Sequence, residues 1–190
     1  ADHGHGFGAF PERCGDILHP CQFRLPPKQG LLLFFLVVEG EKITLAKAEE
    51  TGRPAAGMAL PDGRIVLGKT SDLLGASAAL LLNTLKRLGG IDQSLDLIST
   101  QVLEPICRLK TGSLGHKNPR LHSDEVLIAL CVSALTNPIA ALAQEQIPKL
   151  RGCGAHFTVV LSDVDEKLYK RLGVHVSYEA KYERKRLYFK

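Results

Sequence analysis

Residues 115–136, GHKNPRLHSDEVLIALCVSALT, join a polar, cation-rich loop directly to the most apolar helix candidate of the sequence. Ser123 is a favourable helix N-cap, because its hydroxyl can accept a hydrogen bond from an N–H group of the first turn. Pro138 ends the helix, since the residue before a proline is pushed out of the α region. Between residues 126 and 135 only Ser133 is polar. This pattern predicts a core helix without a solvated face.

Strand and helix patterns alternate on either side of this helix. Residues 57–60 and 64–68 flank a Pro-Asp-Gly turn, which predicts a β-hairpin. The next helix is predicted to be capped by Thr70 or Ser71 and to end at Gly89. Further helices are predicted for residues 42–51, 102–110, 139–150 and 163–172, and further strands for residues 30–38, 95–98, 156–161 and 174–178. The alternation favours an α/β fold, a three-layer α/β/α sandwich with a mixed sheet and buried apolar helices.

Composition and charge exclude several classes of protein. The 190 residues, 45% of them hydrophobic, are enough for one soluble domain with a sizeable core. The formal charge of +4 resides in residues 181–190, where five Lys and Arg residues oppose Glu183, which is 5 − 1 = +4. The rest of the chain is balanced, so nucleic acid is not an expected partner. The apolar run 31–38 is far shorter than the roughly 20 residues that span a bilayer, so no membrane association is predicted.

The cysteines do not form a disulfide pattern. There are five, an odd number without regular spacing, and this usage predicts reduced thiols in a cytoplasmic protein. The histidines and cysteines of the first 21 residues match no closed zinc site, so no metal is predicted there: they are His3, His5, Cys14, His19 and Cys21. His156 lies three residues after Cys153, and a nucleophilic cysteine needs such a base nearby. A structural thiol beside a turn is nevertheless the favoured interpretation of Cys153.

The loop before Ser123 is a candidate anion site. Lys117 and Arg120 lie near the start of a helix, where the dipole contributes roughly half a positive charge. Asn118 adds a neutral donor, and His122 adds charge when it is protonated. Arg120 is predicted to be the principal contact, because its fork can hold two oxygens of a phosphate at once. The alternative is that Arg120 pairs with one of the two acids that follow Ser123 and the loop is solvated.

A second candidate lies after the predicted hairpin. Residues 63–70 satisfy the P-loop expression GxxxxGK[ST], but the intervening run 64–67 is strand-forming and cannot cradle a phosphate. Lys69, at the start of the predicted helix, remains as a second anion site; the alternative is a solvated lysine beside a capping threonine. His122 and His156 are candidate general acids or bases, with a structural role as the alternative for each.

Four segments carry a family resemblance: residues 68–86 (GKTSDLLGASAALLLNTLK), 114–130 (LGHKNPRLHSDEVLIAL), 151–156 (RGCGAH) and 185–190 (KRLYFK). They resemble the carboxyl-terminal domain of the bacterial domain of unknown function 1846 family, and NPRLHS is the most specific part. The resemblance covers residues 46–190 and implies a layered α/β/α domain, without implying an activity or a cofactor. Residues 1–45 do not resemble the family, so they are predicted to be a poorly ordered or non-family extension.

The resemblance strengthens the candidate ligand-binding residues Lys117, Asn118 and Arg120, and to a lesser extent Lys69 and Ser71. It also strengthens His122 and, less, His156 as candidate catalytic residues. The sequence therefore predicts an α/β domain that binds an anionic, phosphate-bearing small molecule, as part of an enzyme site that an amino-terminal domain would complete. The alternative is a structural or oligomerisation module without a ligand, in a homo-oligomer.

Overall fold

The computed structural model describes the backbone of residues 27–182 and the side chains of residues 38–182. Helices and strands alternate along it, as the sequence pattern predicts. In chain order the elements are α1 (Pro27–Thr51), β1 (Ala55–Ala59), β2 (Ile65–Lys69), α2 (Ala76–Leu88), α3 (Thr100–Gly112), α4 (Ser123–Ala134), α5 (Pro138–Gln144), the 3-10 helix η1 (Ile147–Leu150), β3 (Gly154–Phe157), α6 (Asp163–Arg171) and β4 (His175–Tyr178).

The four strands form one mixed sheet in the order β2-β1-β3-β4. β1 is antiparallel to both β2 and β3, and β3 is parallel to β4. The predicted hairpin is confirmed, with Ala59 paired to Ile65 across the turn. The α/β class and the mixed sheet predicted from the sequence are therefore confirmed.

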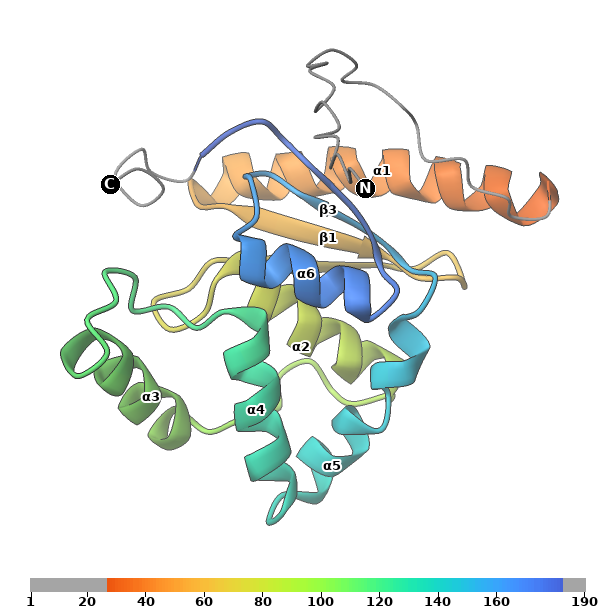
Figure 1. Cartoon of the computed structure of the whole chain (residues 1–190). Coiled ribbons are helices and arrows are strands. Elements are labelled where there is room, and N and C mark those ends of the chain that lie inside the picture. The colour runs from red at the N-terminus through yellow and green to blue at the C-terminus, as the bar shows by residue number, and fades with distance from the viewer. Residues whose placement is uncertain (1–26, 183–190) are drawn as a thin grey trace, which may run out of the picture.

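Helices cover both faces of the sheet. Figure 1 shows α1 along one face and α2 and α6 on the other. Two strand glycines permit this close approach: a Cβ at Gly57 would overlap the side chain of Thr44 in α1, and a Cβ at Gly68 would overlap the backbone of Leu80 in α2. The sheet is thus held between helices that touch its backbone from opposite sides.

The helices α3, α4 and α5 lie beyond α2 and α6, further from the sheet (Figure 1). α4 packs against α2, α5 and α6. Val126 and Leu130 of α4 join Leu81 and Leu85 of α2 and Tyr169 of α6 in the core. The start of α4 is therefore fixed next to the start of α6.

The predicted strand at residues 30–38 is wrong, because this run lies inside α1. A short apolar run reads equally as a buried strand or as a buried helix, since neither needs polar alternation. Gly40 does not end the helix, and it is buried beside Ile65 of β2. The boundary predicted between residues 45 and 46 also falls within α1.

Other predicted elements also differ from the structure. α2 begins at Ala76 with Gly75 as its N-cap, so neither Thr70 nor Ser71 caps it. The predicted strand at residues 95–98 is an irregular segment, in which Leu97 and Ile98 are nonetheless buried while Leu95 is exposed. The predicted helix 139–150 is divided into α5 and η1, with Pro148 in the second piece.

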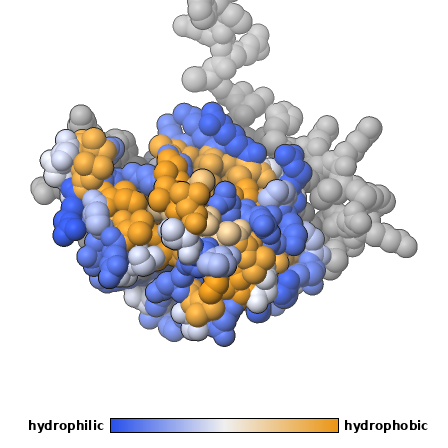
Figure 2. Space-filling view, turned by 90° about the horizontal axis from the view of Figure 1, so that it is seen from below, coloured by the Kyte–Doolittle hydropathy of each residue, from blue (hydrophilic) through white to orange (hydrophobic). Residues whose placement is uncertain are grey.

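The expectation that α4 has no solvated face is also wrong. His122, and not Ser123, is its N-cap. Ile128, Val132 and Leu135 are exposed, and Leu135 retains 82% of its accessible surface. Figure 2 shows hydrophobic residues gathered on the side of the molecule that carries α4 and α5. The apolar helix α4 therefore has one face buried in the core and one apolar face exposed to solvent.

Some predictions fall outside the described residues. These include the zinc-like residues of segment 1–21 and most of the basic segment 181–190. Among the residues that are described, no helix is long and apolar enough to cross a membrane.

Candidate functional site

One pocket lies where three helices begin. Its lining includes Gly75, His122 and Ser162, which are the N-caps of α2, α4 and α6. Phe157 at the end of β3 and Thr70 just beyond β2 also line it. The cavity has a volume of about 60 Å³. This is room for a few waters or for one phosphate or carboxylate group, and it is well below the roughly 300–1,000 Å³ of pockets that enclose a whole small molecule.

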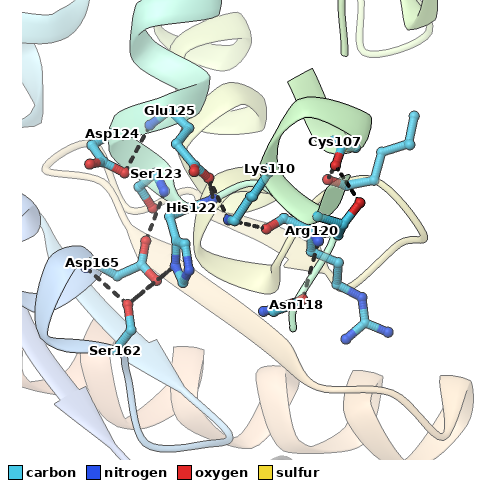
Figure 3. A network of polar contacts seen from close by, with 12 residues as sticks. Cys107, Lys110, Asn118, Arg120, His122, Ser123, Asp124, Glu125, Ser162 and Asp165 are labelled. Atoms are coloured by element: carbon cyan, nitrogen blue, oxygen red, sulfur yellow. Dashed lines mark hydrogen bonds and ion pairs between the residues drawn. The ribbon is translucent and has the colours of Figure 1, made fainter. Parts of the chain in front are cut away.

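The start of α4 is occupied by a carboxylate of the protein itself. Asp165 is buried, and its Oδ1 accepts from the backbone N–H of Ser123 at 2.8 Å (Figure 3). Its Oδ2 lies 3.1 Å from Nδ1 of His122 and accepts from the hydroxyl of Ser162 at 2.8 Å. Burial alone would raise the pKa of Asp165, but the hydrogen bonds from His122 and Ser123 lower it to about 2. The N-terminus of α4 therefore already holds an anion.

His122 is oriented as an acid–base group. The hydrogen bond with Asp165 raises the pKa of His122 above its ordinary value, against the opposing effect of burial. Because Asp165 engages Nδ1, Nε2 is the ring nitrogen left for a ligand. Ser162 lies 3.3 Å from the same Nδ1. In a serine nucleophile triad the hydroxyl meets the other nitrogen, so these three residues do not form one.

A buried lysine fixes the loop that precedes α4. Lys110 is only 2% exposed, and its Nζ donates to Oε2 of Glu125 and to the carbonyl of Arg120, each at 2.7 Å. Oε2 of Glu125 also accepts from the backbone N–H of His122 at 2.7 Å. Sequence reasoning missed Lys110, although it continues the buried stripe of Leu103 and Cys107 at helical spacing in α3.

Arg120 and Asn118 connect this loop to the segment after β2. The Nε of Arg120 donates to the carbonyl of Ser71 at 2.9 Å, and Oδ1 of Asn118 accepts from the backbone N–H of Arg120 at 3.1 Å. Both residues line the pocket, together with His122. The structure thus brings together three of the residues that the sequence selected.

The other predicted residues lie elsewhere. Lys117 and Lys69 are exposed and are not in the pocket lining. Ser71 accepts from the N–H of Leu74 at 3.0 Å through its hydroxyl, so it stabilises a turn. Because α2 starts at Ala76, Lys69 does not precede a helix N-terminus.

His122 and His156 do not share a site. Phe157 packs against Tyr169 of α6 with ring centroids 5.2 Å apart, whereas the neighbouring His156 faces Glu41 of α1. Adjacent residues of a strand point to opposite faces, so His156 and the pocket are on opposite sides of the sheet. The two histidines cannot act on one substrate within this domain.

Cys153 does not have the surroundings of a nucleophile. Its thiol is fully buried and contacts the carbonyl of Lys149 at 3.7 Å. Burial raises the pKa of Cys153 to about 11, which disfavours the reactive thiolate. The interpretation as a structural thiol fits these contacts.

Thr70 and Asp165 are the pocket residues that sequence reasoning missed as ligand or site residues. The sequence suggests Thr70 only as a helix cap and as the last residue of the rejected P-loop expression. In the structure it is 2% exposed, with no hydrogen-bond partner for Oγ1 within the described part of the chain. Asp165 is one of several acids at the start of α6. No local pattern distinguishes it, because its partners His122 and Ser123 are about 40 residues away.

Comparison with known proteins gives a family match over most of the chain. The family described as "Domain of unknown function DUF1846, C-terminal" matches residues 39–188. The chain is 58% identical over 141 residues to UPF0371 protein CE2832 of Corynebacterium efficiens, covering 74% of this chain and 28% of that protein. It is 50% identical over 142 residues to UPF0371 protein DIP2346 of Corynebacterium diphtheriae, and 46% identical over 144 residues to a UPF0371 protein of Streptococcus pneumoniae. Each of these alignments covers about 75% of this chain and 29% of the relative, so the matched part of the chain spans less than a third of the relatives' length.

Proposed function

The chain belongs to the family of DUF1846 carboxyl-terminal domains, and from that premise we propose that it binds the anionic group of a phosphate-bearing small molecule in the pocket where α2, α4 and α6 begin. The observation that carries the proposal is the hydroxyl of Thr70. It lines this pocket, is almost completely buried, and has no partner among the side chains and backbone groups of residues 38–182. A buried hydroxyl without a partner is costly, and a bound oxyanion would satisfy it.

The start of α2 supplies further donors. Its N-cap is Gly75, which offers no side-chain acceptor to the first turn, and Ala76 and Ser77 line the pocket beside it. First-turn N–H groups and the helix dipole favour an anion at this position. The start of α4 differs, because Asp165 already accepts there. The anion position is therefore assigned to α2 and not to the helix after Ser123, where the sequence alone suggested it.

The composition of the pocket agrees with a single bound charge. Arg120 and Asn118 supply polar groups on one side, and the carboxylate of Asp165 is engaged by His122 and Ser123. The small cavity has room for one anionic group, so the rest of the ligand would lie outside this domain. Since the matched part of this chain covers only 28% of the Corynebacterium efficiens relative, the remainder of a longer protein would complete the site.

His122 would then serve as a general acid or base. Asp165 engages its Nδ1, which leaves Nε2 for proton transfer with a substrate in the pocket that His122 lines. A raised pKa keeps the imidazole available as an acid near neutral pH. The cytoplasmic location predicted from the cysteines is proposed together with this function.

Inorganic phosphate titrated by calorimetry into wild type and Thr70→Val tests the binding. Valine keeps the shape of threonine and removes only the unpartnered hydroxyl, so the apo protein should melt at the same temperature or slightly higher. Phosphate affinity should fall by about tenfold, since one charge-assisted hydrogen bond is lost. Thr84→Val is the matched control, because Thr84 is a buried threonine of α2 whose hydroxyl bonds within the helix to Leu80. Equal phosphate affinity in wild type and Thr70→Val, or no binding at millimolar phosphate, would refute the site.

Self-association is the second candidate function, and the exposed apolar face of α4 and α5 favours it. Ile128, Val132, Leu135 and Leu142 are all exposed on these helices and their ends. A second copy of the chain is the proposed occupant, because one self-complementary patch is enough for a twofold dimer. Light scattering on wild type and Leu135→Lys tests it. A concentration-dependent dimer that the lysine abolishes supports this candidate, and a monomer at all concentrations excludes it.

A further inference from the structure

Three potential metal ligands meet on the face of the sheet opposite the pocket. They are Glu41 of α1, His156 of β3 and Glu179 just after β4. One ligand atom from each lies within 4.8 Å of those of the other two. The cluster is thus assembled by the fold from three separate segments, and none of its members belongs to the pocket.

His156 is the buried member, with only 5% of its surface exposed. Its Nδ1 lies 3.0 Å from the hydroxyl of Ser177, which also approaches the carbonyl of Ala155 at 3.5 Å. If Ser177 donates to that carbonyl, it accepts from Nδ1–H, and Nε2 then carries a lone pair. Burial also lowers the pKa of His156, which favours this neutral ring.

The other nitrogen, Nε2, is buried without a hydrogen-bond partner in the described part of the protein. Oε1 of Glu179 is 3.6 Å away, too far for a hydrogen bond. A neutral nitrogen and two carboxylates are all electron donors that repel one another, and a cation between them would satisfy all three.

We propose that Glu41, His156 and Glu179 bind one divalent transition-metal ion, with Zn²⁺ as the probe. Imidazole nitrogen and carboxylate oxygen are ligands that zinc accepts at roughly 2.0–2.2 Å. Such an ion holds its ligand atoms roughly 3–4 Å apart, so the cluster needs only a small contraction. Glu41 and Glu179 are partly exposed and have the side-chain freedom to provide it.

Three protein ligands leave one tetrahedral position for water. The ion would also connect α1 to β3 and to the end of β4. Both of these strands follow the end of α1 by more than 100 residues. The sequence predicts no metal site because ligand spacing is a local signal, whereas residues 41, 156 and 179 lie far apart along the chain.

Zinc content and zinc-dependent melting on the full chain test the site. Wild type, stripped with a chelator and refilled, should bind one Zn²⁺ per chain and melt at a higher temperature. Glu41→Gln and Glu179→Gln should each lower zinc affinity by at least about tenfold, because each removes a charged ligand. Both substitutions keep the side-chain shape, so apo melting near that of wild type verifies folding. Glu39→Gln is the matched control, since Glu39 is exposed on the same helix two residues away, and it should bind zinc as wild type does.

Two outcomes of this zinc experiment would overturn the proposal. One is the absence of stoichiometric zinc in refilled wild type. The other is zinc binding that persists at full affinity in both glutamine variants, which would locate the ion elsewhere, for example at the histidines and cysteines of residues 1–21. Mn²⁺ is tested in parallel, and a preference for zinc over manganese supports the imidazole as a ligand. His156→Asn tests that ligand directly, because zinc binding unaffected by this substitution would contradict the role of His156.

Discussion

Oδ1 of Asp165 accepts a hydrogen bond from the backbone N–H of Ser123 at 2.8 Å, so a side chain of α6 caps α4 across 42 positions of sequence. The same carboxylate orients His122, and Ser162 supports it from the start of its own helix. A single buried charge therefore links the two helix starts and the acid–base candidate.

Asp165→Ala should lower the free energy of unfolding by about 3 kcal/mol, because it removes one partner of a buried charged pair and leaves the N–H of Ser123 unsatisfied. Urea denaturation at neutral pH measures the change. Asp163→Ala is the control, since Asp163 is exposed in the first turn of the same helix and contributes less than about 1 kcal/mol through the dipole. Similar losses in both variants would contradict a special role for Asp165.

The stabilising effect of the His122–Asp165 pair should depend on pH in both directions. The pKa of Asp165 is lowered from 3.8 to about 2, so its contribution is present above 3.8 and is lost as the pH falls towards 2. The pKa of His122 is raised above 6.5, so its contribution is full below 6.5 and is lost as the pH rises through the higher folded value. The pair therefore stabilises most between these two ranges.

The test compares the free energy of unfolding of wild type with that of His122→Asn across this range. The difference should be largest near about pH 5–6 and should shrink as the pH approaches about 9. A difference that grows with rising pH would mean that the folded protein holds His122 neutral, contrary to its hydrogen bond with Asp165.

Lys110→Met should destabilise the protein by about 3 kcal/mol, because it leaves Glu125 without its buried cation and the carbonyl of Arg120 without a donor. Lys47→Met is a suitable control, since Lys47 pairs with Glu50 at the surface and such pairs contribute about 0–1 kcal/mol. Thermal unfolding of both variants distinguishes the buried pair from the exposed one. Equal losses would show that Lys110 is solvated.

Gly68→Ala should destabilise the protein by at least about 2 kcal/mol, since the new methyl would overlap the backbone of Leu80 and force α2 away from the sheet. Gly112→Ala should be neutral or stabilise by up to about 1 kcal/mol, because Gly112 is the last residue of α3 and has open space around it. Chemical denaturation of the two variants measures the contrast. A tolerated Gly68→Ala would mean that β2 and α2 are less closely packed than described.

The local elements could be predicted from the sequence because their signals are local. The Pro-Asp-Gly turn defines the hairpin, and Ser162 followed by acids defines the start of α6. The strand predicted at residues 30–38 was wrong because an apolar run without polar alternation does not distinguish strand from helix. The outer face of α4 was missed for a related reason, since hydrophobicity indicates which residues avoid water but not whether enough protein exists to cover them.

The site was predictable only in part. Asn118, Arg120 and His122 lie together because one short loop carries them, and the sequence identified that loop. Thr70 and Asp165 reach the pocket from other segments. Thr70 stands out because its buried hydroxyl has no partner within the described residues, and Asp165 stands out because it contacts Ser123, about 40 residues away in the chain. Lys110 could have been identified, because a charged residue in an apolar helical stripe requires a buried counter-charge.

The alternation of β3 has a consequence for how this domain can vary in length. Phe157 fills the core against Tyr169, and His156 faces Glu41 on the other side. Inserting or deleting one residue between Gly154 and Phe157 would exchange these faces, with an imidazole forced into the apolar core and a phenyl ring set among carboxylates. Substitutions can alter either side of β3 separately, but any change in its length would damage both sides at once. Natural insertions in relatives should therefore fall in the connections before or after β3 and not within the strand.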